Sequence, residues 1–149
     1  MSLEDDPVYP FVKLIDSGID TVEINELFST DPSLVLFYPS RSCRACVEKI
    51  IELLNEEIKL LGLKNIIMIT DFSDVREYAV FCRINKIQFP VYNVISNSEG
   101  IASLMAYEPY YAILNNSLIK SSVFIIPKDN PFLTKQYFKI ISNKFFNTN

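Results

Sequence analysis

Two cysteines separated by two residues, Cys43 and Cys46, are the side chains of this sequence whose type and spacing best suit a chemical reaction. Across one helical turn the second thiol can reach the first, so the pair can close a small disulfide ring and reopen it by thiol exchange. The attacking group in that exchange is a thiolate, which forms readily only where the surroundings lower the thiol pKa. The chemistry therefore depends on where the chain places Cys43.

The sequence around the pair changes from a strand pattern to a helix pattern. Residues 34–38 are an apolar run of strand length, and Pro39 followed by a polar turn ends it. Beyond the turn, apolar residues recur at helical spacing, at Val47, Ile50, Ile51, Leu54, Ile58 and Leu61. We therefore expect Cys43 in the first turn of a helix, where unpaired backbone N–H groups and the helix dipole stabilise a thiolate.

Two arginines, Arg41 and Arg44, flank the first cysteine and are expected to lower its pKa further, below the value of about 8.5 for a free cysteine. We expect Cys43 to be the exposed nucleophile and Cys46 to be the more buried resolving thiol. The cysteine pair has two other candidate roles: it could be half of a zinc site, or a pair left in an inactive domain. A zinc site needs four ligands, and the sequence offers only one more cysteine, Cys82, and no histidine. We therefore predict no metal, whereas the inactive domain stays open.

The third cysteine, Cys82, falls on the apolar stripe of a predicted helix over residues 71–83, in line with Val75, Tyr78 and Ala79. A free cysteine behaves as a small buried hydrophobe. We therefore expect Cys82 to pack in the core and not to act as a third redox thiol.

The order of strand, turn, Cys-Arg-Ala-Cys and helix resembles the active-site segment of the thioredoxin-like superfamily, most closely its TlpA-like branch of secreted or membrane-tethered thiol-disulfide oxidoreductases. Residues 109–120 continue the resemblance, because a proline followed by two strands around Asn115–Asn116 is similar to the family's cis-proline and hairpin. The match covers residues 31–146. It implies an α/β thioredoxin-like fold with a central mixed β-sheet flanked by helices over residues 31–149, after an N-terminal arm or short extra elements over residues 1–30.

The resemblance also implies a function. A thioredoxin-like oxidoreductase of this kind exchanges disulfides with protein substrates and with a second redox partner, serves cell redox homeostasis and needs no bound cofactor; Cys43 and Cys46 would be its catalytic pair. The alternative is a redox-silent thioredoxin-like module that binds a protein partner through the same groove. The resemblance favours a periplasmic or membrane-tethered extracytoplasmic location, and a cytoplasmic one stays open. Residues 1–7 lack the basic and apolar regions of a signal peptide, so we expect the targeting segment to be absent from this chain.

The substrate contacts follow from the same resemblance. The family binds its substrate through the loop of its cis-proline beside the cysteines, which implies a substrate-binding set of Ser42, Arg44, Glu108 and Pro109. Pro90 competes with Pro109 for the cis-proline because it is nearer to the cysteines in the sequence. The strands and terminal helix that follow Pro109 favour Pro109.

Three residues depart from the family's pattern. Ser42 stands where many members carry an aromatic residue, and Phe37 stands where many carry a buried carboxylate that relays a proton. Glu108 precedes the candidate cis-proline, where a small or β-branched residue is common. Near the thiols its charge would raise the pKa of Cys43 and its carboxylate would accept a proton from Cys46, whereas a solvated loop carboxylate would do neither.

Composition excludes other classes of protein. The chain has 149 residues, of which 49% are hydrophobic and 21% charged, which suits one globular domain. A net charge of −4 without a basic cluster argues against nucleic-acid binding. The sequence contains no apolar run of about 18 residues, so we expect no transmembrane segment. The absence of histidine excludes His-based acid–base catalysis.

The remaining elements follow from periodicity and turn signals. The predicted strands are a short edge strand within residues 11–15, a buried parallel strand at 65–70, a short strand at 91–95, and a hairpin of 110–114 with 118–126. The predicted helices are one or two turns at 24–28, the helix at 71–83 capped by Asp71 or Ser73, a helical segment from 101, and a final helix from 133. Gly62 is expected to end the first long helix.

Overall fold

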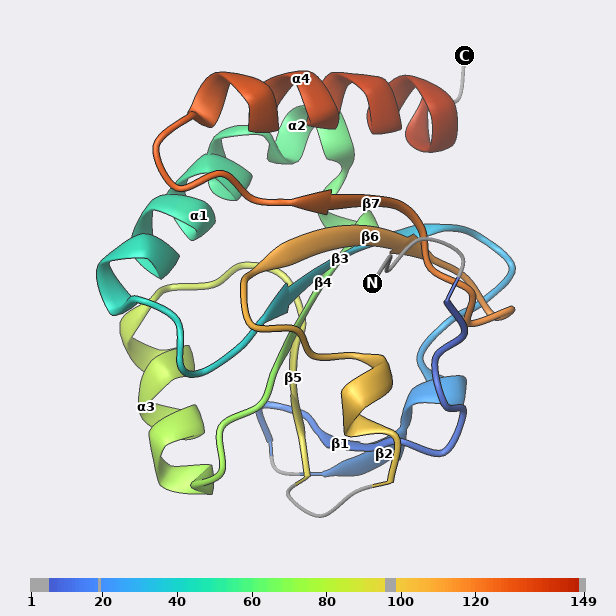
Figure 1. Ribbon diagram of the computed structural model, residues 1–149, viewed down its shortest axis with the longest axis vertical. Coiled ribbons are helices and arrows are strands. Elements are labelled where there is room, and N and C mark those ends of the chain that lie inside the picture. Colours follow the sequence, from blue (N-terminus) through green and yellow to red (C-terminus); the bar gives the residue numbers. More distant parts are fainter. Residues whose placement is uncertain (1–5, 19, 96–98, 148–149) are drawn as a thin grey trace.

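A computed structural model describes residues 6–18, 20–95 and 99–147 of the chain. One mixed sheet of seven strands, in the order β2-β1-β5-β4-β3-β6-β7, runs through the molecule (Figure 1). The strands are β1 (Lys13–Ile15), β2 (Thr21–Glu23), β3 (Ser33–Tyr38), β4 (Ile66–Thr70), β5 (Val91–Val94), β6 (Tyr110–Leu114) and β7 (Ser121–Ile125). The α-helices are α1 (Arg44–Glu56), α2 (Ile58–Leu61), α3 (Val75–Ile84) and α4 (Pro131–Ile141). The shorter turns are η1 (Ile24–Glu26), η2 (Leu63–Asn65), η3 (Ile101–Ser103) and the π-helical η4 (Ser142–Phe146).

The centre of the sheet has the predicted topology. Strands β3, β4 and β5 are parallel neighbours, and β6 and β7 add antiparallel strands beside β3. In this register Leu36 of β3 lies opposite Met68 of β4 on one side and Tyr111 of β6 on the other. Helices α1 and α3 are the crossovers of the parallel strands, so the α/β fold with a mixed sheet is confirmed.

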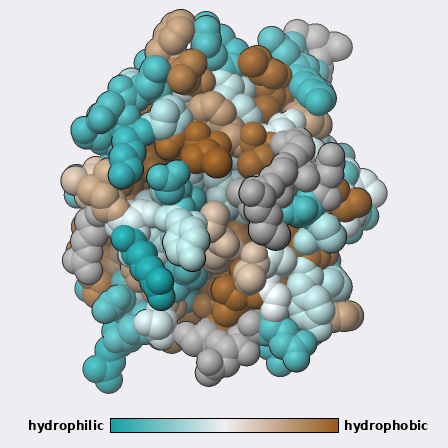
Figure 2. Space-filling view, viewed as in Figure 1, coloured by the Kyte–Doolittle hydropathy of each residue, from teal (hydrophilic) through white to brown (hydrophobic). Residues whose placement is uncertain are grey.

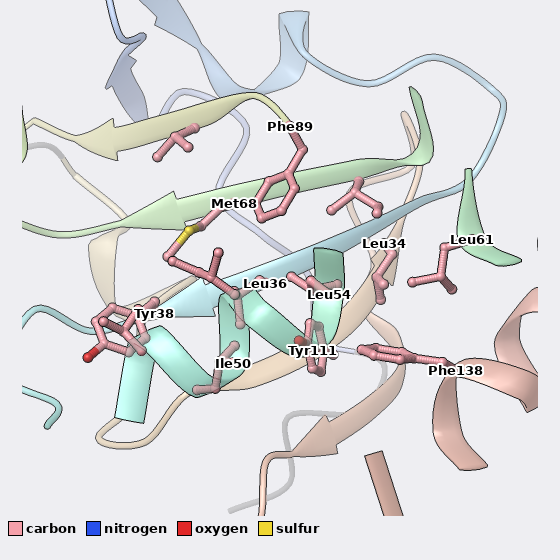
Figure 3. Packing of buried hydrophobic residues seen from close by; sticks show 14 of the residues in the cluster. Leu34, Leu36, Tyr38, Ile50, Leu54, Leu61, Met68, Phe89, Tyr111 and Phe138 are labelled. Carbon is pink, nitrogen blue, oxygen red and sulfur yellow. The ribbon is translucent and has the colours of Figure 1, made fainter. Parts of the chain in front are cut away.

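The two faces of the sheet are covered differently. The larger cluster of buried apolar side chains joins β3, β4 and β6 to the four α-helices, and Figure 3 shows Leu36 and Tyr38 of β3 against Ile50 and Leu54 of α1. The smaller cluster covers the opposite face, where Phe37 packs with residues from the N-terminal segment and the η3 region. Since both faces of β3 are buried, its continuous apolar run is explained.

The N-terminal segment contributes to this sheet. Strand β1 pairs with β5 on one side and with β2 on the other, so the expectation that it forms an edge strand is wrong: β2 takes the edge. Val8, Val12, Ile24 and Phe28 are buried in the smaller cluster. The division of the chain between residues 30 and 31 stays a prediction.

Three local expectations differ from the structure for identifiable reasons. The helix predicted from Cys43 to Leu61 is interrupted at Glu57. Its predicted end at Gly62 is confirmed, and the φ of 89° there suits glycine. Helix α3 is capped by Asp74, whose carboxylate accepts the N–H of Arg76 at 2.8 Å, in place of Asp71 or Ser73. The segment from residue 101 forms only the short η3 turn.

The hairpin between β6 and β7 is present, but, contrary to expectation, the positive φ in its turn is not at an asparagine. Leu118 has the positive φ, 58°, and Asn115 uses its side-chain oxygen to accept the N–H of Ser117 at 2.9 Å. Strand β7 consequently begins at Ser121, later than predicted.

The surface seen from the side of Figure 1 has no continuous apolar face. Hydrophobic residues reach it in separate places between hydrophilic ones (Figure 2). Within the part of the chain that the structure describes, no helix has both the length and the apolar character needed to cross a bilayer.

Candidate active site

The cysteine pair lies at the junction of β3 and α1, as predicted. Strand β3 ends at Tyr38, a turn closed by the N–H of Ser42 on the carbonyl of Pro39 (3.0 Å) follows, and Cys43 is the residue that precedes α1. The carbonyl of Cys43 accepts hydrogen bonds from the N–H groups of Cys46 (3.1 Å) and Val47 (3.3 Å). The first turn of α1 therefore begins directly at the first thiol.

Two side chains for which the sequence predicted no role at the site hold this junction. The hydroxyl of Tyr38, which is buried against α3, donates to the carbonyl of Cys43 at 2.9 Å. The carboxylate of Asp71, in the loop after β4, accepts the N–H of Ser40 at 2.6 Å. Because β3 and β4 are parallel, their carboxyl ends share one edge of the sheet, and that is the signal that could have found Asp71.

The two thiols differ in exposure and in acidity. Cys43 is exposed, Cys46 is half-buried, and both are free thiols. The hydrogen bond from the Cys46 thiol, together with the N–H groups of Cys46 and Ala45, lowers the pKa of Cys43 from its ordinary value. The same thiol contact, then burial and the charge of Cys43, raise the pKa of Cys46. These directions agree with an attacking Cys43 and a resolving Cys46.

The cation that assists the thiolate comes from a different part of the chain than expected. Lys128, in the loop between β7 and α4, lowers the pKa of both Cys43 and Cys46 through its charge. Arg41 lines the same groove, whereas the side chain of Arg44 lies outside the described residues. Lys128 was missed because nothing in a single sequence shows that the loop after the hairpin returns to the cysteines.

Both cysteines line a groove with a cavity volume of about 860 Å³. Ser42, Glu108 and Pro109, three members of the predicted substrate-binding set, line it as well. Its walls are α1, the loop before β6 and the loop between β7 and α4. The N–H of Ile126 donates to the carbonyl of Pro109 at 3.2 Å, which joins the two loops. The exposed thiol of Cys43 therefore lies in the wall of a groove.

The cis-proline expectation is wrong in its geometry. Every peptide bond within the three described ranges is trans, including those before Pro90 and Pro109. A trans bond is the ordinary preference of X–Pro. Pro109 reaches the groove without a cis bond because the next residue, Tyr110, pairs with Phe37 of β3. Pro90 instead precedes β5, where its carbonyl accepts the N–H of Met68 at 2.9 Å.

Glu108 is exposed at the wall of the groove. The alternative in which its charge dominates Cys43 and raises the pKa of that thiol is wrong, because the donors at the start of α1 lower it. A role for Glu108 as proton acceptor stays a prediction.

Cys82 is half-buried on α3, where it packs against the larger cluster, and burial raises the pKa of its thiol. Its predicted neighbours Val75 and Ala79 are exposed, so the apolar stripe of α3 is instead made by Tyr78, Phe81 and Cys82.

The comparisons with known proteins bear on the fold. No protein-family model and no curated protein sequence matches the chain. The thioredoxin domain of a thiol-disulfide oxidoreductase from Bacteroides vulgatus matches with a TM-score of 0.70 at 14% identity, over 98% of this chain and 100% of that one. A thioredoxin-like protein from Porphyromonas gingivalis gives 0.67 at 14% identity, over 93% and 94%.

A peroxidoxin, BcpB from Mycobacterium tuberculosis, is similar over 97% of this chain and 98% of its own, with a TM-score of 0.64 at 15% identity. The likeness thus extends to proteins of more than one activity, and at such identities it describes the backbone alone. The strand order, the helix that starts at the cysteine pair and these similarities establish that the chain has a thioredoxin-like fold.

Proposed function

We propose that this protein is a thiol-disulfide oxidoreductase of protein substrates, with Cys43 as nucleophile and Cys46 as resolving thiol. The observation that carries the proposal is the pair of free thiols with opposite pKa shifts at the first turn of α1, open to a groove. A purely structural pair of cysteines does not require that one thiol be exposed and have a lowered pKa.

The reaction is a sequence of two thiol exchanges. The Cys43 thiolate attacks one sulfur of a substrate disulfide, the substrate S–S bond breaks, and the released thiolate takes a proton from water. The Cys46 thiol then loses its proton and its sulfur attacks Sγ of Cys43, which releases the second substrate thiolate. The substrate gains two electrons and the protein ends with a Cys43–Cys46 disulfide. A dithiol partner reverses these steps to regenerate the thiols, and the same chemistry run backwards oxidises a substrate.

The groove supplies the substrate contacts in this proposal. An extended polypeptide lies along Ser42, Glu108 and Pro109, the members of the predicted set that line the groove with the thiols. A substrate contact by Arg44 stays part of the proposal on the resemblance alone. Glu108 accepts the Cys46 proton from the wall of the groove. The TlpA-like branch and an extracytoplasmic location belong to the proposal and rest on the resemblance of the sequence.

The division of labour between the thiols gives the direct test. Cys46→Ser should trap a long-lived mixed disulfide between Cys43 and a substrate, because the resolving thiol is gone. Cys43→Ser should trap little, since Cys46 is half-buried and has a raised pKa. Non-reducing gels of both variants after incubation with a disulfide-containing protein extract measure this. Equal trapping by both variants would refute the asymmetry.

A redox-silent binding module and a peroxidase are separated from the proposal by turnover. The proposal expects the wild-type protein to accelerate reduction of insulin disulfides by dithiothreitol and expects Cys43→Ser not to. Absence of turnover, with no trapped adduct from either variant, would support the binding module. The similarity to a peroxidoxin adds one arm: consumption of hydrogen peroxide faster than insulin reduction would favour a peroxidase.

A further inference from the structure

The turn that carries the thiols is held from outside by Asp71. Its Oδ1 lies 2.6 Å from the backbone nitrogen of Ser40, which makes a short hydrogen bond to a charged acceptor. The Ser40 hydroxyl also lies 3.5 Å from the carbonyl oxygen of Asp71. The two residues are 31 positions apart in the sequence, so this contact ties two separate loops together.

The contact between Asp71 and Ser40 restrains the middle of the turn. The hydrogen bond of the turn itself uses the carbonyl of Pro39 and the N–H of Ser42. The carbonyl of Cys43 is held by Tyr38 and by the first turn of α1. The N–H of Ser40 lies between these two anchors and faces Asp71.

The residues on either side of Asp71 are held by a buried side chain of β5. Asn93, which is 2% exposed, accepts the N–H of Phe72 at 2.7 Å and donates to the carbonyl of Phe72 at 2.8 Å. It also accepts the hydroxyl of Thr70 at 2.8 Å. The residues before and after Asp71 are therefore fixed to the sheet, and the carboxylate is aimed at the turn.

We propose that Asp71 is a positioning residue for the thiol pair: by holding the N–H of Ser40 it fixes the turn so that Cys43 stays over the first N–H groups of α1 and within reach of Cys46. This inference deepens the proposed function and rests on it for its biological meaning. A purely structural hydrogen bond would contribute to folding but would leave the acidity of Cys43 unchanged.

Two effects of Asp71 on Cys43 have opposite signs, which makes the proposal testable. Loss of the acceptor frees the turn, weakens the donors to the thiolate and raises the pKa of Cys43. Loss of the negative charge alone favours a nearby thiolate and lowers that pKa. Lys128 and Cys46 act on the same thiol and Arg41 lines the same groove, and a change at Asp71 leaves all three intact.

The experiment measures the rate of Cys43 alkylation by iodoacetamide against pH in four proteins. Asp71→Ala should raise the pKa of Cys43 and slow its alkylation several-fold at pH 6 to 7. Asp71→Asn keeps an oxygen acceptor for Ser40 without the charge, so it should retain the wild-type pKa or a lower one. Asp74→Ala is the matched control. It removes another carboxylate of the same loop, one that caps α3 by accepting the N–H of Arg76 instead of the N–H of Ser40. Mass spectrometry of the Cys43 peptide separates its labelling from that of the other thiols.

Asp71→Asn and Asp71→Ala lack the same charge and differ in the acceptor, so an equal Cys43 pKa in these two variants would overturn the proposal. Amide hydrogen exchange of Ser40 in the wild-type protein tests the contact without any variant. Slow exchange is expected, whereas exchange as fast as in an unfolded peptide would overturn the proposal even where Asp71→Ala does not fold. A wild-type protein without insulin reduction would refute the proposed function and leave these two measurements still able to decide the role of Asp71.

Discussion

Replacement of Asn93 by alanine should destabilise the protein strongly, because this buried amide uses both of its polar atoms. Its oxygen accepts from the Thr70 hydroxyl and the Phe72 N–H, and its nitrogen donates to the carbonyls of Phe72 (2.8 Å) and Val94 (3.2 Å). Alanine leaves all four groups without this partner. A buried polar group left unsatisfied costs about 1–3 kcal/mol.

The magnitude follows from how well water can reach each group. The contact to Val94 is fully buried and should cost near the middle of that range. The Thr70 hydroxyl keeps the carbonyl of Tyr92, 3.4 Å away, as a second acceptor, so its loss should cost near the low end. The two groups of Phe72 are only partly buried, and water can replace much of their loss. We therefore expect the free energy of unfolding to fall by about 3 kcal/mol, a large share of the about 5–15 kcal/mol typical of a domain. With a urea dependence of about 2 kcal/mol per M, the midpoint should fall by roughly 1.5 M.

Urea unfolding followed by far-ultraviolet circular dichroism, under reducing conditions, measures this midpoint. Asn115→Ala is the matched control, because it removes the same amide from an exposed turn where the oxygen accepts one N–H, from Ser117. That change should cost about 0.5 kcal/mol. If Asn93→Ala costs no more than Asn115→Ala, the four contacts do not carry the stability assigned to them and the reasoning fails.

The remaining predictions concern the thiols and the groove. The rate of Cys43 alkylation against pH should give a pKa below that of a free thiol. This lowered pKa stabilises the folded, reduced protein at pH values above the pKa that Cys43 has in the unfolded chain. The stabilisation is lost as the pH falls through the pKa that Cys43 has in the folded protein. Lys128→Gln should raise the pKa of Cys43, whereas Lys135→Gln, in the same groove, should not; equal effects would contradict the role of Lys128. Cys82 should react slowly in the native protein and fully after denaturation, and Cys82→Ala should preserve insulin reduction and cost about 1 kcal/mol in unfolding free energy.

The central part of the fold could be predicted because local pattern and topology agree there. The apolar run of β3 followed by the helical period of α1 indicates a parallel crossover, and the structure contains it. The interruption at Glu57 could not be foreseen, since the apolar period continues across it. The pairing of β1 with both β2 and β5 also depends on long-range contacts that three-residue strands do not reveal.

The site was predictable to the extent that it is local in sequence. Cys43 and Cys46 lie where the strand-to-helix pattern predicts them. The resemblance to the thioredoxin-like superfamily pointed to Pro109, which lines the groove. Folding alone brings Lys128, from the loop after β7, to the thiols and Asp71, from the loop after β4, to the turn that carries them. A charge beside a cysteine in the sequence, such as Arg41, was therefore a weaker guide than a charge beside it in space.

In the proposed reaction, Cys46 would have to lose a proton without the buried acid that many thioredoxin-like proteins carry. The matching residue, Phe37, is buried and stacks on Tyr110 at a ring distance of 4.6 Å. The carboxylates that line the groove are exposed ones, those of Glu52, Glu56, Glu108 and Asp129.

In the proposed reaction, the state of Cys43 controls when Cys46 can lose its proton for the second thiol exchange. The pKa of Cys46 is raised first by its hydrogen bond to Cys43, then by burial and then by the charge of Cys43. When Cys43 enters a mixed disulfide it loses its charge and becomes a poor acceptor, so two of these three causes disappear together. The pKa of Cys46 then falls at the stage at which its thiolate must attack, while Lys128 and Lys49 continue to favour the charged form. In the proposed reaction, Cys46 would therefore keep its proton until a substrate reacts with Cys43, and would release it to the groove once the first exchange is complete.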